Sequence, residues 1–278
     1  DTKLVALRYG NDDSIKITTS YITPSGAIIA EKDQVKDLGV MMSNDASFNS
    51  HIDLITESAK NLSSWILRTF KTRKEEPMIL LWKTLMLPTI EYCSVLWSPI
   101  KVFQIQKLEN LQWAYLRKVN KQNNFLNYWE TLKYFKLYSL QRRRERYRII
   151  YTWKIIEGLV PNINNKVISS QHPRHGRRLQ LYCPASSSKK YDGFMPQHGV
   201  KLFNLLPKHI RSISSTSLSI FKSALDKFLV EVPDEPLLPS YTLYRRADSN
   251  SLIHMVNLVP FKFQMNRGRV GLDLNIRP

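Results

Sequence analysis

The segment that most restricts the fold of this chain is Arg142 to Arg148, RRRERYR, which runs directly into the apolar sequence IIYTWKII. It holds five arginines and one acid in seven positions. Because successive residues of a helix are rotated by about 100°, a helix through this segment carries arginines on every side of its axis. An unpaired guanidinium costs several kcal/mol to bury, so these side chains need partners.

The predicted apolar stripe of this helix includes two of the arginines. Its members are Leu140, Arg144, Tyr147, Arg148, Tyr151 and Ile155. Two explanations remain open for this stripe. Either acids such as Glu109 or Glu130 pair with the arginines, or this side of the helix lines a groove that phosphate fills.

The charge balance of the whole chain favours a polyanionic partner. Its 41 Lys and Arg residues exceed its 23 Asp and Glu residues and give a net charge of +18. Nucleic acid is the first candidate partner and an anionic membrane surface the second. The remaining alternative is a basic protein without a specific partner.

Two basic segments are candidate nucleic-acid-binding sites. One follows the first predicted helix and has the sequence RTFKTRK, and the other is the arginine segment described above. Between Lys101 and Lys154 aromatic residues alternate with 13 basic residues and only three acids, a composition suited to phosphate contacts and base stacking. The predicted binding residues are Arg68, Lys71, Arg73, Lys74, Arg142, Arg143, Arg144, Arg146 and Arg148.

The pattern of residue types predicts an α+β fold that is mainly α. Residues 1–43 are rich in β-branched and aromatic residues and predict short antiparallel hairpins, with AIIAEK paired to VKDLGVMMS around KDQ. Residues 44–159 predict a helical thumb-like bundle, and residues 160–195 a basic polar linker. Residues 196–240 predict a small helical unit, and residues 241–278 a weakly ordered tail.

Apolar residues at helical spacing define the predicted bundle. Ser50 is the expected N-cap of its first helix. The apolar segment from Met78 to Trp97 contains Lys83, Pro88 and Glu91, so it predicts two buried helices joined at Pro88 and no membrane span. The expected core positions are Ile52, Ile55, Ala59, Leu62, Ile66, Ile105, Leu108, Leu111, Ala114 or Tyr115, Val119, Leu218, Phe221, Ala224 or Leu225, and Phe228.

No catalytic or metal-binding site is predicted. Asp12 and Asp13 lie between turn-forming residues rather than apolar strands, so they indicate a hairpin turn. His172 and His175 are flanked by arginines that oppose a cation. The two cysteines form no C-x-x-C pair, and the start of the chain has no signal-peptide core, so we expect a reducing intracellular compartment, either nucleus or cytoplasm.

An ordered set of segments resembles a known family. These are VKDLGVMMSNDASFNSHI, ILRTFKTR, LMLPTIEYCSVLWSP, IQKLENLQ and YSLQRRRERYRIIYTWKIIEGLVPN, followed by FMPQHGVKLFNLLPKHIRS. Together they resemble the region downstream of the polymerase palm in reverse transcriptases of non-LTR retrotransposons of the jockey-like, LINE-type group. The resemblance covers nearly the whole chain.

The resemblance implies a truncated RNA-directed DNA polymerase. The parent family uses Mg²⁺ and catalytic aspartates that lie upstream of the matching region, so we expect this chain to be inactive alone and to bind no cofactor. Lys36, Asp37, Leu38 and Gly39 resemble the hairpin called the primer grip. The implied function is sequence-independent binding of an RNA–DNA template–primer by the thumb, with a possible contact to the missing palm and fingers. The alternatives are a helical protein–protein interaction module and a decayed element without function.

Overall fold

The structure is a computed structural model in which helices predominate, as the sequence predicts. It describes residues 4–9, 20–119, 126–162, 168–169, 180–182, 194–214, 217–236 and 249–256. The chain divides into two compact units. The first comprises Asp1–Cys93 and Gln106–Lys121, and the second comprises Ser94–Ile105 and Gln122–Pro278.

Short strand pairs begin the first unit. Strand β1 (Val5–Ala6) pairs in parallel with β2 (Ala30–Glu31). Strands β3 (Gln34–Asp37) and β4 (Val40–Ser43) form an antiparallel hairpin. The predicted pairing around KDQ is therefore wrong, because the chain reverses within VKDLGVMMS, at Leu38 and Gly39. The expected turn at Asp12 and Asp13 lies outside the described residues.

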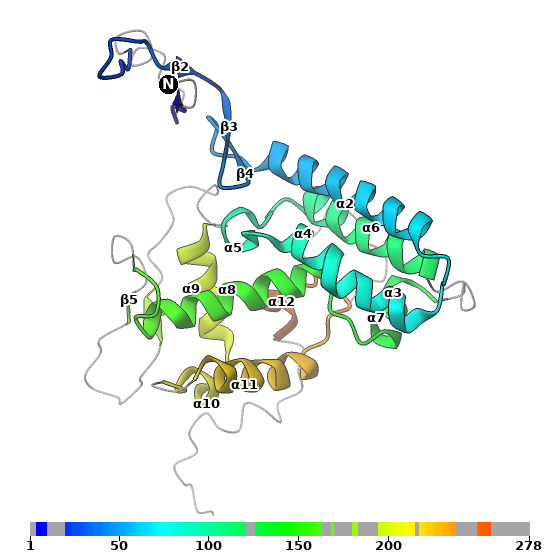
Figure 1. Cartoon of the computed structure of the whole chain (residues 1–278). Coiled ribbons are helices and arrows are strands. Elements are labelled where there is room, and N and C mark those ends of the chain that lie inside the picture. The colour runs from blue at the N-terminus through cyan, green and yellow to red at the C-terminus, as the bar shows by residue number, and fades with distance from the viewer. Residues whose placement is uncertain are drawn as a thin grey trace, which may run out of the picture. The chain divides into compact units, whose positions relative to one another are not determined.

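Three helical segments form the body of the first unit (Figure 1). Helix α2 (Asn49–Thr69) buries Ile52, Ala59 and Ile66 of the predicted stripe, whereas Ile55 and Leu62 are half-buried. Its N-cap residue is Phe48 rather than Ser50, so the helix begins slightly earlier than predicted. The second segment combines α3 (Glu75–Leu81), the π-helical turn η1 (Trp82–Met86) and α4 (Leu87–Glu91).

The sequence predicts two helices joined at Pro88, and in the structure Pro88 lies in the first turn of α4, which follows η1 without a loop. Proline has no N–H to donate, and the helix widens just before it, so that the Leu87 N–H donates to the Trp82 carbonyl, five residues back. Thr84 and Thr89 donate their hydroxyl groups to the carbonyls of Leu80 and Leu85. The helix ends instead at Tyr92, and Cys93 adopts a φ of 52°.

The third segment is α6 (Val102–Val119), whose residues from Gln106 belong to the first unit. Leu108, Leu111, Tyr115 and Val119 are buried, so Tyr115 rather than Ala114 completes the predicted stripe. The Tyr115 hydroxyl donates to the Met78 carbonyl at 2.9 Å. Its ring packs against Trp82 at 5.1 Å between centroids. These contacts join α6 to α3 and η1.

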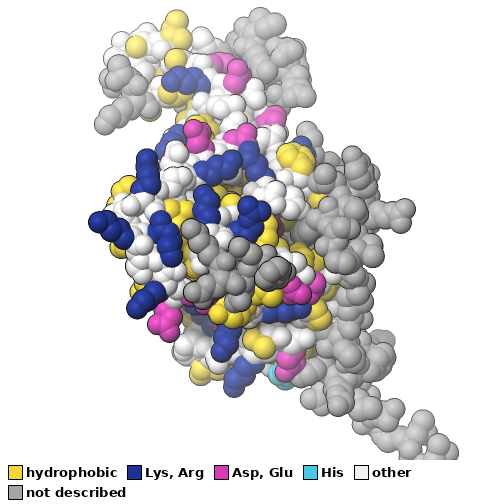
Figure 2. Space-filling model, turned by 90° about the vertical axis from the view of Figure 1, so that its right-hand side faces the viewer, with side chains coloured by type: hydrophobic (Ala, Val, Ile, Leu, Met, Phe, Trp, Pro, Cys, Tyr) yellow, Lys and Arg dark blue, Asp and Glu magenta, His cyan; other side chains and the backbone are white. Residues whose placement is uncertain are grey.

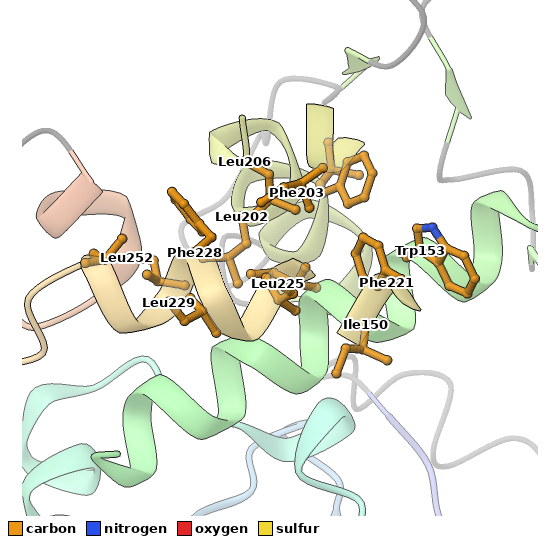
Figure 3. Close-up of a cluster of buried hydrophobic side chains, with 14 of the residues drawn as sticks. Ile150, Trp153, Leu202, Phe203, Leu206, Phe221, Leu225, Phe228, Leu229 and Leu252 are labelled. Atoms are coloured by element: carbon orange, nitrogen blue, oxygen red, sulfur yellow. The ribbon is translucent and has the colours of Figure 1, made fainter. Parts of the chain in front are cut away.

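The second unit is built around α8 (Leu140–Ile156) and its C-terminal helices. The other elements are α5 (Ser94–Trp97), α7 (Tyr128–Tyr134), β5 (Ile168–Ser169), β6 (Leu181–Tyr182), α9 (Met195–Leu205), α10 (Lys208–Arg211), α11 (Leu218–Glu231) and α12 (Leu252–Met255). Figure 3 shows side chains of α8, α9, α11 and α12 that point toward one another in one apolar core. Within it Trp153 stacks on Phe221 at 4.8 Å.

The compact units divide the chain differently from the predicted domains. The sequence places α8 in the thumb-like bundle of residues 44–159 and α9 in a separate unit after a linker. In the structure α8 packs closely on α9, because the apolar positions Ile149, Ile150 and Trp153 are buried against the C-terminal helices. Most of the predicted linker at 160–195, including His172 and His175, lies outside the described residues.

The segment 249–256 is ordered, although the sequence predicts a weakly ordered tail from Tyr241. Leu252 and Met255 are buried in the core. Glu145 of α8 is fully buried and accepts hydrogen bonds from the Ser251 hydroxyl at 2.5 Å and the Leu252 N–H at 2.8 Å. Burial raises the pKa of this carboxyl, and the two hydrogen bonds oppose the rise. The rest of the predicted tail lies outside the described residues.

Gly199→Ala is expected to destabilise the second unit by about 1–3 kcal/mol, as overpacked cores generally are. A β-carbon at this position would lie 2.4 Å from the Thr152 hydroxyl oxygen, so α9 would have to move away from α8. Urea unfolding measures the loss. Thr152→Ala in the same chain removes the clashing oxygen and should recover part of it. Wild-type stability of Gly199→Ala would contradict this close approach.

Candidate nucleic-acid interface

The hairpin that resembles a primer grip ends in an exposed turn. Leu38 and Gly39 have φ angles of 44° and 87°, so both central residues are left-handed, as in the tight turns typical of two-residue hairpins. The Leu38 side chain is 84% exposed. The Tyr92 hydroxyl donates to the Leu38 carbonyl at 3.0 Å. Lys36, Asp37, Leu38 and Gly39 are thus accessible, and their role at a primer stays a prediction.

His51 fastens this hairpin to α2. The Met41 N–H donates to the His51 Nδ1 atom at 3.3 Å, which requires that nitrogen to be unprotonated. The residue is 3% exposed, and burial, with a smaller contribution from the charge of Lys36, lowers the pKa of its imidazole. Neutral His51 therefore belongs to the folded state.

Arg142 lies inside the second unit and not at a surface. Its side chain is 0% exposed. It donates to the Val232 carbonyl at 3.0 Å and to the Pro233 carbonyl at 2.6 Å, and its Nε lies 3.7 Å from an Asp234 carboxylate oxygen. These groups are the backbone carbonyls and the acid that directly follow the end of α11. The arginine therefore holds the C-terminal end of α11 against the first turn of α8.

The neighbouring arginines also contact the protein itself. Arg144 is 1% exposed and donates to Gln141 at 3.1 Å. Arg143 donates to the Tyr147 hydroxyl at 3.0 Å. Arg146 forms a two-pronged ion pair with Asp226, in which Nη2 lies 2.7 Å from Oδ2.

Arg148 is buried without a hydrogen-bonding partner for two of its nitrogen atoms. The residue is 2% exposed, and its Nε and Nη2 atoms make no hydrogen bond to any part of the chain that the structure describes. Burial lowers its pKa to about 10, and the negative charge of Glu145 opposes the shift. The side chain therefore stays protonated at neutral pH.

The arginine segment thus serves mainly the protein interior. Of the acids proposed as its partners, Glu130 forms the capping box of α7 with Asn127. Glu109 is buried, and its pairing with the arginines stays a prediction. Asp226 and Asp234, which follow the segment by 80 to 92 residues, are further partners that the sequence did not indicate. The predicted phosphate contacts of Arg142, Arg144 and Arg148 stay a prediction, and their burial weighs against it.

The second predicted segment is mostly exposed. Arg68, Lys71 and Lys74 are exposed at the end of α2 and in the connection that follows it. Arg73 is half-buried, and its guanidinium donates to the carbonyls of Leu67 and Phe70. Arg73 therefore caps the C-terminal end of α2, whose last carbonyls have no partners within the helix.

Two further cations lie at the same end of the first unit. Arg117 and Lys118 are exposed in the last turn of α6. Helix α6 runs alongside α2 in the same direction (Figure 1), since Lys107 pairs with Asp53 near the start of α2 and the charge of Arg73 acts on Tyr115 near the end of α6. We call this set the basic end. It consists of Arg68, Lys71, Lys74, Arg117 and Lys118.

The charges of the basic end have only a partial structural explanation. Arg68, Arg117 and Lys118 lie in last helical turns, where cations oppose the negative end of the helix dipole. Lys71 and Lys74 lie outside a helix and have no such role. The guanidinium of Arg117 lies 5.9 Å from the centre of the Trp113 ring. Figure 2 views the molecule from the side where α2 ends, and Lys and Arg side chains gather on it.

Acids near the basic end are few among the described residues. Glu75 and Glu76 occupy the first turn of α3, where acids favour the helix N-terminus. Arg68, Lys71, Lys74 and Lys118 form no ion pair within the described parts of the chain. Sequence reasoning did not single out Arg117 and Lys118, although adjacent cations at a helix end beside a tryptophan were a usable signal.

Comparisons of the chain with protein-family models, with curated proteins and with solved structures found no match. Within the described ranges, no group of three or more His, Cys, Asp or Glu residues could hold a metal ion. None of the helices there combines the length and apolar character that crossing a membrane requires.

Acidification should lower the stability of the first unit, because His51 is buried in its neutral form. Because its pKa is lower in the folded than in the unfolded chain, the unfolded chain binds more protons, and stability falls as the pH drops below the ordinary value of about 6.5. Urea unfolding of the wild-type chain at pH 7.5 and 5.5 measures this difference. His51→Gln can still accept from Met41 but does not titrate, so the difference should shrink. An equal difference in both chains would contradict the assignment.

Removal of Arg142 and removal of Arg148 should change the stability of the protein differently. Arg142→Ala should destabilise the protein by about 3–5 kcal/mol, because it leaves Asp234 and two carbonyls without their partner. Arg148→Met should be neutral or stabilising, because it removes a buried charge whose Nε and Nη2 atoms have no hydrogen bond. Thermal or urea unfolding of both variants tests this pair. A large stability loss in Arg148→Met would show that this guanidinium has a partner in the folded chain.

Proposed function

We propose that this chain binds nucleic acid without sequence preference, through phosphate contacts at the basic end. The observation that carries the proposal is the set of exposed cations at the ends of α2 and α6, of which Arg68, Lys71, Lys74 and Lys118 form no ion pair among the described residues. Cations without protein partners remain available to neutralise phosphates.

Phosphate binding by such a surface follows from simple electrostatics. Each Lys or Arg that neutralises a phosphate releases condensed counterions, so affinity rises steeply as salt falls. Phosphate contacts position a nucleic acid but do not read its bases. The net charge of +18 adds a long-range attraction that steers a polyanion toward the protein.

The proposal extends to the origin of the chain. Its ordered motifs resemble the post-palm region of non-LTR retrotransposon reverse transcriptases, which makes an RNA–DNA hybrid the preferred ligand to test. The mainly helical architecture with short N-terminal strand pairs is compatible with that region. The proposed role is binding alone, with no polymerisation by this chain.

A protein partner is the second candidate, favoured by exposed apolar side chains in the first unit. Leu54 and Trp65 are 41% and 47% exposed and lie about three turns apart on the same side of α2. Leu80 of α3 is 60% exposed. Exposed apolar groups of this kind suit docking to another protein surface, whose affinity depends little on salt.

Binding to a labelled RNA–DNA hybrid across a salt series tests the proposal. The wild-type chain should show a log–log slope of roughly −4 to −5, from about 0.9 per phosphate contact on B-DNA. The triple variant Arg68→Gln, Lys71→Gln, Lys74→Gln should make the slope shallower by roughly 2 to 3. Fluorescence anisotropy with hybrids of two unrelated sequences measures both slope and sequence preference.

A matched control separates local contacts from total charge. Lys32→Gln, Lys83→Gln, Lys154→Gln removes the same charge from residues that are not part of the basic end and should change the slope much less. Equal slopes in the two triple variants would mean that only total charge matters and would refute the assignment to the basic end. A flat slope in the wild-type chain would refute phosphate binding and favour the protein partner.

A further inference from the structure

One face of α11 borders a groove in the second unit, remote in sequence from the basic end. The groove has a volume of about 550 Å³. Its lining includes Ser219 and the residues that follow it by three, four, seven and eight positions, namely Lys222, Ser223, Asp226 and Lys227. Residues at this spacing share one side of a helix. The polar side chains that line it are Arg146, Ser219, Lys222, Ser223, Asp226 and Lys227.

The groove carries a net positive charge that the protein does not neutralise. Asp226 is already held by both prongs of Arg146. This pairing raises the pKa of Arg146, so the guanidinium stays charged and fixed in orientation. Lys222 and Lys227 form no ion pair among the described residues. The balance of three cations and one carboxylate leaves two positive charges.

Hydroxyl groups and a helix end complement these charges. Ser219 and Ser223 line the same groove as the two lysines. Ser219 lies in the first turn of α11, and the side chain of the N-cap residue Ser217 makes no capping bond to the backbone there. The positive end of the helix dipole therefore lies close to Ser219. Ammonium and hydroxyl donors on one face suit an anion with several oxygen atoms that accept hydrogen bonds, such as phosphate.

We propose that the groove between α8 and α11 is a second phosphate-binding surface for nucleic acid. This inference rests on the proposed function and adds a phosphate-binding surface in the second unit. Each surface contributes its own share of the salt dependence of binding.

A second groove of about 580 Å³, with Ile210, Ile220 and Phe228 in its wall, lies on the other side of Ser219 and Ser223. Lys222 and Arg146 line only the groove between α8 and α11, so their charges favour an anionic ligand there. A peptide with acidic and apolar side chains is the alternative ligand that the test must distinguish.

The test is the hybrid-binding salt series, carried out with the full chain. Lys222→Gln, Lys227→Gln should weaken binding at low salt and make the log–log slope shallower by roughly 1 to 2. Lys154→Gln, Lys208→Gln removes the same charge from positions that do not line the groove between α8 and α11 and should leave the slope near the wild-type value. Circular dichroism should show the wild-type fold in both, because all four lysines are exposed or half-buried.

Each result decides between the proposals. If the groove variant and its control have equal slopes while the basic-end triple variant has a shallower one, the groove inference is overturned and the proposed function stands. If the wild-type chain does not bind the hybrid, both are overturned. If the groove variant loses binding to an amphipathic Leu and Glu peptide but keeps its hybrid slope, the groove is a protein site and the phosphate assignment is overturned.

Discussion

The second unit depends on the contacts that hold the end of α11 against the start of α8. Arg142 donates to the carbonyls of Val232 and Pro233, and Asp234 accepts from the Ser139 N–H at 2.7 Å and from its hydroxyl at 2.8 Å. Asn250 donates to both Ser139 and Asp234. Three segments far apart in the sequence therefore meet in one hydrogen-bonded network. Its groups satisfy one another, which is the condition under which buried polar groups are tolerated.

This network explains why a helix with arginines on every side is stable inside a protein. The hydrophobic positions of α8 alone do not define a buried face, since Arg142, Arg144 and Arg148 are as buried as Ile149. For Arg142, the carbonyls at the end of α11 provide acceptors and Asp234 provides the compensating charge, whereas Nε and Nη2 of Arg148 find no acceptor among the described residues. The core of the second unit is thus partly ionic, and the C-terminal segments supply some of its polar contacts.

Most helices could be predicted from the sequence because apolar residues recur at helical spacing, as with Ile52, Ala59 and Ile66 in α2. What failed depended on contacts between distant residues. Periodicity could not show that Asp234, read only as a helix stop, pairs with Arg142. Nor could it show that the chain passes Pro88 as a helix, because the π-helical turn there depends on local hydrogen bonding. The hairpin turn was misplaced because Leu38, a residue that rarely takes a positive φ, occupies it.

The candidate site could be predicted only in part, because the contacts that engage some of its cations are made by residues distant in the sequence. A count of cations does not distinguish those that serve the fold from those that remain free for a ligand. In the two predicted segments, Arg73 caps a helix and Arg146 pairs with Asp226, while Lys71 and Lys74 have no such partner. A protein that binds a polyanion needs cations of the second kind, held in place by cations of the first. In the proposed binding mode the arginine-rich helix acts indirectly, because it positions Arg146 and the face of α11 that carries Lys222 and Lys227.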